Sequence, residues 1–370
     1  MSLHPRPVVL KDREVFTDTA TIRQALAGLG AVSAIDIKLR ATTGATSKQG
    51  VYIHDDVDTI DVKDGSDILY SLNGIESQAL TCYHNHKMPA AIFREGAAVV
   101  EEETFTVHFG RFLGDERYWL DTDQYRNPLL ELALTLAISA TAGFATGTGR
   151  VSIVAWIWDE KPAVREGVLI SKEYKEFTSL ASGDDLTELP IDLPHRLLLV
   201  RAYEANVLYE TDITQILLRA NRGGKILLNM EPEMVRDIAR QRYGSFSYGV
   251  ELFRTDADTV DTFLHLIDSV ALQALQDLDI ATIDARLANR LTLQLLTLAV
   301  TPTIAKSTTD RAIDAVVHGF IPFGTLPLLI ADPDDPDDWL DPGQYNNMQL
   351  VLTQGGAAAT VQVFGQQVMR

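Results

Sequence analysis

The chain carries the stretch WLDTDQYRNPLLEL at residues 119–132 and repeats it as WLDPGQYNNMQLVL at residues 339–352. Aligned without gaps, eight of the fourteen positions are identical. A Phe-Gly pair precedes each copy, and an apolar segment follows each one. Internal repeats indicate the architecture before any local pattern does. Two copies 220 residues apart are too few and too distant for a solenoid, so they predict two related domains in tandem.

The residue types of the repeat are those of a tight turn that leads into a strand. Asp and Asn side chains hydrogen-bond to nearby backbone in turns, while Trp and Tyr combine a large apolar body with a polar tip. We interpret the repeat as a buried structural corner; a binding site formed by both copies is the alternative. The residues concerned are Trp119, Asp121, Tyr125, Asn127, Trp339, Asp341, Tyr345 and Asn347.

Composition restricts the class of protein. The 370 residues are 46% hydrophobic and 22% charged, as in a soluble globular chain of two or three domains. A net charge of −19 argues against direct binding of nucleic acid, which needs a basic surface. The single cysteine excludes an intramolecular disulfide. The N-terminus lacks the apolar core of a signal peptide, and the longest apolar run, 128–142, is too short to span a bilayer. We therefore expect cytoplasmic synthesis and no membrane insertion.

The first half of the chain is expected to be mainly β. Residues 1–30 read as a polar, extended arm (1–16) followed by a short helix (17–29). Residues 31–180 are expected to form the first domain, because apolar and polar residues alternate strictly at 35–40 and 104–109.

The second half is expected to repeat this domain with an addition. Residues 181–195, rich in Gly, Asp and Pro, read as the linker, and residues 196–370 as the second domain. Residues 258–277 carry an apolar stripe at helical spacing, and a second helical piece follows it. A helical insertion is therefore predicted at about 258–289. The stripe consists of Val260, Phe263, Leu264, Ile267, Val270, Ala271, Ala274 and Leu275.

The segment 151–158 is apolar at both alternating sets of positions. A strand with one solvated face would alternate apolar and polar residues, so this one is expected to be covered on both sides. The second cover is either residues 159–180 of the same chain or a neighbouring subunit.

Two clusters have residue types that bind metals. Cys82, His84 and His86 lie at alternating positions, but their spacing is no standard zinc pattern and no second ligand cluster exists. The aspartate loop, residues 332–338, holds five carboxylates but lacks the glycine and the distal glutamate of an EF-hand. We expect a polar strand or loop at the first and a solvent-facing, metal-free loop at the second, with calcium there as the alternative.

No motif reaches the level of a catalytic proposal. The glycine-rich stretch 143–150 lacks the Gly-Lys-Ser/Thr ending of a phosphate loop, and a strand rather than a helix follows it. Neither G-x-S-x-G nor H-E-x-x-H occurs in the chain. We therefore assign no catalytic, cofactor-binding or metal-binding residues and expect a protein that is not an enzyme.

Two related β domains, each closing with a Trp/Tyr corner and apolar strands, resemble the double jelly-roll major capsid proteins of tailless icosahedral viruses and phages. The resemblance covers residues 31–370 and rests on architecture, length and the duplication, not on a diagnostic motif. It implies two β-sandwich (jelly-roll) domains of eight strands each, with inserted helices and long loops. It further implies that three subunits form a pseudo-hexagonal capsomer.

The resemblance thus implies a viral structural protein located in the virion. Its partners are other copies of the same chain, in a homotrimer and a higher-order shell, and possible further virion proteins. The alternatives are another phage structural or receptor-binding protein, and a tandem carbohydrate-binding or glycosidase β-sandwich. A sugar-binding protein should expose aromatic platforms, yet two of the four tryptophans lie in the repeated corner, and a glycosidase needs two facing carboxylates.

Overall fold

The computed structural model describes residues 4–46, 51–204, 207–252, 259–263, 265–276, 279–285, 290–294 and 313–370. Eight strands of the N-terminal half form two four-stranded layers, ordered β1-β10-β3-β7 and β2-β9-β4-β5, each of which is part of a larger sheet. In chain order they are β1 (Arg6–Val15), β2 (Thr19–Ala25), β3 (Ala31–Thr42), β4 (Val57–Asp64), β5 (Asp67–Leu72), β7 (Val100–His108), β9 (Pro128–Thr135) and β10 (Arg150–Trp158). Two shorter strands, β6 (Ala91–Glu95) and β8 (Leu120–Asp121), pair with β7 and β3 respectively.

The C-terminal half repeats this arrangement with the orders β11-β24-β13-β22 and β12-β23-β14-β15. Its strands are β11 (Val168–Thr178), β12 (Gly183–Leu189), β13 (His195–Tyr203), β14 (Ile213–Ala220), β15 (Lys225–Met230), β22 (Thr325–Leu328), β23 (Met348–Gln354) and β24 (Thr360–Met369). Numbered within each half, both sets read 1-8-3-6 and 2-7-4-5, which is the strand order of a jelly roll. The predicted mainly β chain of two tandem, related jelly-roll domains is therefore confirmed. We refer to them as the first and the second roll.

Period-two patterning explains why these segments form sandwiches. In β3, Ile35, Ile37 and Leu39 are buried, whereas Asp36 and Lys38 between them are only half-buried. The first set faces the interior of the first roll and the second set faces outward, as the strand pleat requires. Each roll contributes a large buried apolar cluster, and that of the first roll continues onto the outer face of β13 and β24.

A helix follows the fifth strand in each roll. The helix α1 (Gly74–Asn85) begins at Asn73, whose side chain accepts a 2.9 Å hydrogen bond from the Glu76 N–H, while Glu76 accepts one from the Asn73 N–H. This reciprocal pair is a capping box. The helix α3 (Pro232–Tyr243) begins at a proline and is followed by Gly244 at φ 69°, as helix boundaries favour. The remaining short elements are α2 (Tyr209–Asp212), η1 (Ile53–Asp55), η2 (Thr122–Gln124), η3 (Asn221–Gly223) and η4 (Pro342–Gln344).

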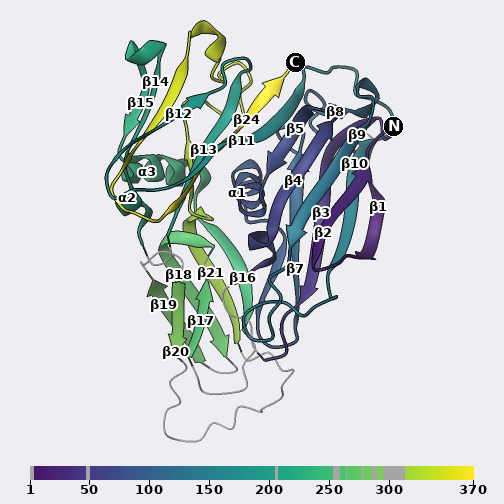
Figure 1. Ribbon diagram of the computed structural model, residues 1–370, viewed down its shortest axis with the longest axis vertical. Coiled ribbons are helices and arrows are strands. Elements are labelled where there is room, and N and C mark those ends of the chain that lie inside the picture. The colour runs from purple at the N-terminus through teal and green to yellow at the C-terminus, as the bar shows by residue number, and fades with distance from the viewer. Residues whose placement is uncertain are drawn as a thin grey trace, which may run out of the picture.

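The two rolls are joined by strand pairing and by α1. Strands β5 and β11 run parallel, with Ser171 opposite Tyr70 and Lys172 opposite Ser71, so one sheet passes from the first roll into the second. The helix α1 lies between the rolls (Figure 1). A second parallel pair joins β6 to β16 (Phe246–Leu252), and the sheet continues through β21 (Ile313–Pro322), β18 (Leu266–Gln276) and β19 (Asp279–Ala285).

The structure corrects the N-terminal prediction. Residues 17–29 were predicted as a helix, but β2 pairs in register with β9 over its whole length. The β-branched residues Thr19, Thr21 and Ile22 favour an extended backbone, and the half-exposed period-two pattern of β2 fits an edge strand. Residues 6–15 of the arm, which was predicted to be extended, form a second edge strand, because β1 pairs with β10.

The helical insertion predicted at about 258–289 is also wrong for the residues of this range that the structure describes, which exclude 258, 264, 277–278 and 286–289. The structure has β17 (Thr259–Phe263), which pairs with β20 (Arg290–Gln294), and the strands β18 and β19. Leucine, alanine and glutamine fit either period, and β18 satisfies its backbone groups through ladders with β19 and β21. Of the predicted stripe, only Ile267 has a described side chain, and it is buried.

The predicted linker, 181–195, is partly a strand. Within it, β12 pairs with β23 from Gly183 to Leu189 without a break. The preceding strand β11 pairs with β24 along its length, so residues 168–178 hydrogen-bond within the second roll. Tertiary pairing thus overrides the turn-like composition of this segment.

Candidate functional site

The two copies of the repeat fold into the same turn. Both enter a single 3-10 turn, η2 in the first roll and η4 in the second. In each, the preceding Asp accepts a hydrogen bond from the backbone N–H two residues later, at 3.2 Å for Asp121 and 2.9 Å for Asp341. The backbone angles of these two residues are also alike, φ −93° and ψ 97° against φ −87° and ψ 104°. Local side chain to backbone bonding therefore makes the corner.

The tyrosines and asparagines of the repeat fix the start of the next strand. Tyr125 is half-buried, and Tyr345 is buried with its hydroxyl accepting a 2.8 Å hydrogen bond from Lys225 Nζ. The backbone N–H of Asn127 donates to a carboxylate of the first roll, and the side-chain oxygen of Asn347 accepts from the backbone of the second. Asn127, Tyr345 and Asn347 thus each hold their corner to another segment of the same roll.

The two tryptophans of the repeat lie in separate apolar clusters. Trp119 packs with Trp158, the ring centroids being 6.1 Å apart, and the Arg165 guanidinium lies 5.4 Å from its ring. Trp339 packs 5.3 Å from the ring of Tyr118, which directly precedes the first repeat. Burial and separation favour a structural corner over a binding site shared by both copies, and Trp339 also connects the second corner to the first roll.

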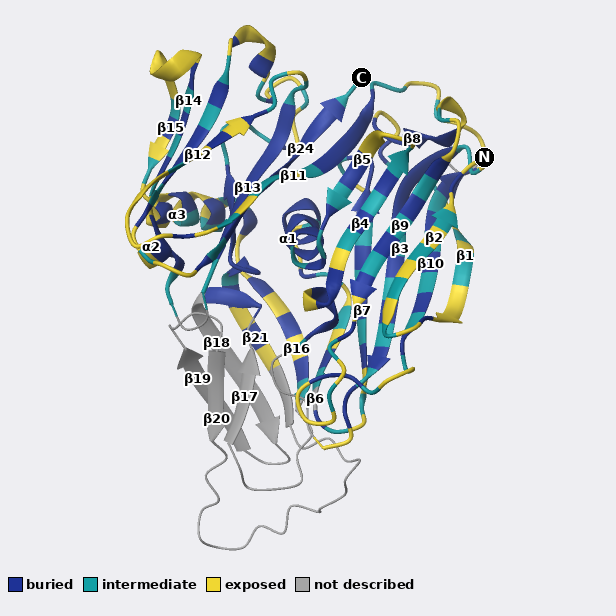
Figure 2. Cartoon of the chain, in the orientation of Figure 1, coloured by how far each residue is buried: buried dark blue, intermediate teal, exposed yellow. Residues whose placement is uncertain are grey.

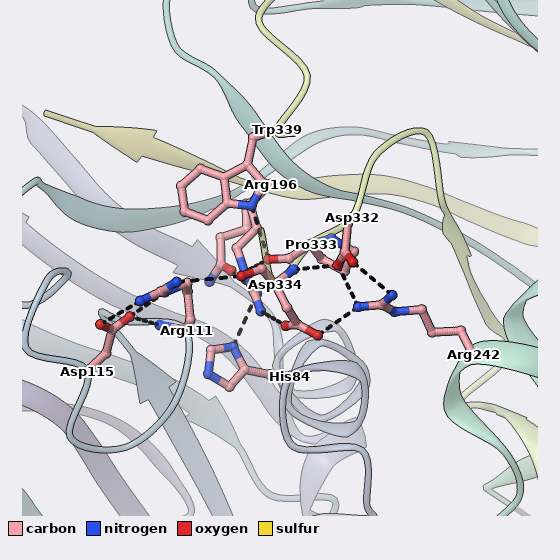
Figure 3. A network of polar contacts seen from close by, with 10 residues as sticks. His84, Arg111, Asp115, Arg196, Arg242, Asp332, Pro333, Asp334 and Trp339 are labelled. Carbon is pink, nitrogen blue, oxygen red and sulfur yellow. Dashed lines mark hydrogen bonds and ion pairs between the residues drawn. The ribbon is translucent and has the colours of Figure 1, made fainter. Parts of the chain in front are cut away.

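The aspartate loop beside Trp339 is held by arginines. The indole N–H of Trp339 donates to the carbonyl of Pro333 at 3.1 Å. Arg242 Nη2 donates to Asp332 at 2.6 Å and to Asp334 at 2.7 Å (Figure 3). The backbone N–H of Asp334 and the Arg242 guanidinium hold the pKa of Asp332 below its ordinary value. Most of the loop faces solvent, and its carboxylates neutralise cationic side chains of the same chain.

Arg196, from β13, reaches the same loop from the protein interior. It is 4% exposed; its Nε donates to the Pro333 carbonyl at 2.9 Å and its Nη1 to Gln366 Oε1 at 2.6 Å. Burial lowers the pKa of its guanidinium, an effect that the nearby Asp334 carboxylate opposes. A buried cation held mostly by neutral acceptors depends on all of them, because losing one leaves a desolvated charge.

Two stacked histidines lie beside Arg196. Together with Arg196 and the aspartate loop they form a polar contact between the two rolls, which we call the junction. His84 of α1 and His108 of β7 stack with centroids 3.8 Å apart and planes at 12°, and Arg196 Nη1 lies 3.4 Å from His84 Nδ1. Burial, reinforced by the positive charge of Arg196, lowers the pKa of His108 to about 3. Burial also holds the pKa of His84 well below its ordinary value. Both rings are therefore neutral in the folded protein near pH 7.

A second polar layer lies farther along the same junction. Arg201 of β13 donates to Gln362 Oε1 at 2.9 Å and to the carbonyl of Phe323 at 3.1 Å. Glu76 of α1 is fully buried near it, and burial, together with the charge of Glu173, raises the pKa of Glu76 to about 8. The junction thus contains ionisable groups, such as Glu76 and His108, whose pKa values are shifted mainly by burial.

The triplet Cys82, His84 and His86, whose residue types could bind metal, does not converge. It lies at the end of α1, not on a strand or loop as predicted. Cys82 is buried with its sulfur 3.5 Å from that of Met88, and burial raises the pKa of its thiol. His84 faces Arg196, whereas the His86 ring packs on Tyr243. Among the described residues, no group of three or more His, Cys, Asp or Glu side chains is placed to hold a metal ion.

Sequence reasoning missed the junction. A signal was present, since Arg196 and Arg201 enclose four consecutive apolar residues in one strand. Where such a strand is buried along its whole length, the charged residues at its ends need partners. Their partners, which are His84 and residues between Phe323 and Gln366, lie more than a hundred residues away in the chain, and local patterns do not identify them.

Comparison with family models and with curated protein sequences finds no match. Solved structures do match over nearly the whole chain. The MCP of STIV shares 11% identity and a TM-score of 0.57, covering 98% of this chain and 96% of that one. The major capsid protein P2 of bacteriophage PM2 shares 10% identity and a TM-score of 0.53, covering 99% and 98%. VP54 of PBCV-1 shares 8% identity and a TM-score of 0.52, covering 98% and 92%.

These matches are double jelly-roll major capsid proteins. The strand orders described above agree with that fold in both halves. The chain therefore has the double jelly-roll fold. No helix in the described part of the chain is long and apolar enough to cross a membrane.

Proposed function

We propose that the chain is a major capsid protein with a structural rather than a catalytic role. The observation that carries the proposal is the duplication: each half is a complete jelly roll, and the pair covers nearly the full length of known double jelly-roll capsid proteins. Since fold alone does not define function, the proposal also rests on what the described residues offer. They form a structural corner in each roll and a polar junction between the rolls, and Trp339 connects the second corner to the first roll.

We further propose that the domain boundary lies in the connection 159–167. Apart from the parallel pairs β5–β11 and β6–β16, the strands before it pair within the first roll, and β11 begins the second. Each domain then contains one corner and one helix after its fifth strand. The division differs from the sequence-based one because pairing, not composition, defines which residues share a core.

Three copies of a duplicated chain supply six similar units, so we propose a homotrimer with a near-hexagonal outline. Two outward faces support self-association. On the first roll, Val154 and Trp156 of β10 point outward and are only half-buried, and Val9 of the adjacent β1 is 62% exposed. A hollow of about 270 Å³ lies beside Trp156. Residues 159–180 therefore do not fully cover this face.

The second roll presents an apolar row on its own outer face. Leu186, 50% exposed, stands opposite Val351, which is only 5% exposed and stands opposite the half-buried Leu217 on the next strand. The strands that bear these two faces, β10 and β12-β23-β14, lie on opposite sides of the molecule (Figure 1). A contact between two different faces is heterologous, and such contacts close into rings when the rotation permits.

The proposal places the protein in the virion, after synthesis in the host cytoplasm, with other virion proteins as further partners. The net charge of −19 argues against direct contact with nucleic acid. Mass photometry of the purified chain tests the assembly. We expect a species of three times the 40.8 kDa chain mass. A monomer that forms neither trimers nor particles at micromolar concentration contradicts the proposal.

A further inference from the structure

The surface by which the first roll contacts the second has an equivalent on the second roll, and there the equivalent side chains are exposed. At the junction, β5 pairs with β11, and one face of α1 is closed off by the second roll. That face consists of Glu76, Leu80 and Tyr83, which are 0%, 3% and 3% exposed. Tyr83 donates its hydroxyl proton to a carbonyl of β22 and its ring packs on residues of the second roll. Figure 2 shows α1 buried over nearly all its surface.

Strand register gives the equivalent positions in the second roll. In the first roll Val62 stands opposite Tyr70, with a register shift immediately after. In the second roll Leu218 stands opposite Leu228, again with a register shift immediately after. The same irregularity at the same place aligns β15 with β5. Counting along the strands, Leu228 corresponds to Tyr70, and Asn229 to the residue after Tyr70.

The same correspondence extends to the helices. Both α1 and α3 have 12 residues, and each begins two positions after the last residue of the strand before it. The counterparts of the buried α1 face are Met234, Ile238 and Gln241. Met234 is 54% exposed, Ile238 is 38% exposed and Gln241 is exposed. The face that the second roll covers on α1 is therefore open on α3.

The partner strand of the junction also has a counterpart. In the second roll, Ser171 of β11 stands opposite Gln366 of β24. Gln366 in turn stands opposite Leu197 of β13, next to a register shift. In the first roll, Pro7 of β1 stands opposite Trp156 of β10. Trp156 in turn stands opposite Ala34 of β3, next to the equivalent register shift. Pro7 therefore corresponds to Ser171, and Val8 to the residue after Ser171. Among the described strands, β1 and β15 both end their sheets, and open edges favour pairing with another strand.

We propose that a second copy of the chain completes this open junction. Strand β15 of one chain pairs in parallel with β1 of the next, with Leu228 and Asn229 opposite Pro7 and Val8. The Met234–Ile238 face of α3 then lies against the outer face of β10 and β3, beside the hollow at Trp156. The inference rests on the proposed capsomer and names its subunit contact. It repeats between chains the arrangement that β5, β11 and α1 make within one chain.

Side-chain directions agree with this pairing. Leu228 points into the second roll, as its counterpart Tyr70 points into the first. Pro7 points out of the first roll, as its counterpart Ser171 points out of the second. Pro7 has no N–H to donate, so this edge supports only a short ladder. The existing junction is equally short, with two residue pairs, and most of the contact there is made by α1.

Disulfide trapping between chains tests the register. Cα atoms of directly opposed residues on neighbouring strands lie within the roughly 4.4–6.8 Å that a disulfide requires. A Val8→Cys/Asn229→Cys variant should, under mild oxidation, give dimers and trimers on non-reducing gels that reductant reverses. The matched control is Val9→Cys/Asn229→Cys, whose residue 9 faces the opposite side of the strand. The native Cys82 is buried and adds little background.

The outcomes separate this inference from the capsomer proposal. Trimers by mass photometry together with crosslinking confined to the Val8→Cys/Asn229→Cys pair support both. Trimers without crosslinks, or with equal crosslinking in the control pair, overturn the contact and leave the capsomer proposal intact. A protein that stays monomeric overturns both. Ile238→Glu should abolish trimers, whereas Val164→Glu, a change at an exposed apolar residue in the 159–167 connection, should leave them; the reverse result also overturns the contact.

Discussion

Replacing His108 by glutamine should make the protein less sensitive to acid between pH 7 and pH 5. The pKa of His108 is about 3 in the folded protein against an ordinary value of 6.5. Below pH 6.5 the unfolded chain therefore binds a proton that the folded chain does not, so the free energy of unfolding falls as the pH drops toward 3. At about 1.36 kcal/mol per unit, this single group removes about 2 kcal/mol of stability between pH 7 and pH 5.

Urea unfolding at the two pH values, followed by tryptophan fluorescence at one protein concentration, measures this loss. Contributions from other groups, such as the buried Glu76, are common to both proteins and cancel when the wild type is compared with His108→Gln. The loss between pH 7 and pH 5 should be about 2 kcal/mol smaller in the variant. His4→Gln, at an exposed histidine, should behave as the wild type. Equal losses in the wild type and in His108→Gln would refute the reasoning.

Three further predictions concern stability at pH 7, each measured by urea unfolding. Glu76 has a pKa of about 8 when folded against an ordinary 4.5, so the folded chain holds a proton that the unfolded chain releases; Glu76→Gln should stabilise by up to about 3 kcal/mol, and a destabilised variant contradicts this. Arg196→Met should cost about 2–4 kcal/mol by orphaning buried acceptors, whereas Arg242→Met, at a half-exposed pair, should cost about 1 kcal/mol or less; equal costs contradict the burial argument. Asp121→Ala and Asp341→Ala should each cost about 1 kcal/mol, and very different costs would show that the two corners are not equivalent.

The duplication and the fold class were predictable because the evidence for them is local. The turn at Asp121 and its copy at Asp341 are made by side chains bonding to backbone two residues away, and such chemistry is readable in sequence. The same holds for alternation in β3, where Ile35 and Ile37 face the core and Asp36 does not. Period two indicates a half-buried strand whatever the topology is.

The errors occurred where distant pairing determines the structure. Residues 266–276 fit a helical stripe, yet strands on both sides hold them extended. Residues 183–189 resemble a linker, yet β23 pairs with all of them. The junction was missed for the same reason, because the partners of Arg196 come from the far end of the chain. Long-range contacts leave only indirect marks on a sequence, here a charged residue at each end of an apolar strand.

Electron microscopy of the purified assembly tests the central claim most directly. If the chain is a capsid subunit built from two equivalent rolls, class averages viewed down the symmetry axis should show six lobes around a near-hexagonal outline. Three-fold symmetry should relate alternate lobes, since each chain supplies one first roll and one second roll. Single two-lobed particles of one chain each, unchanged as the protein concentration rises, would contradict the account.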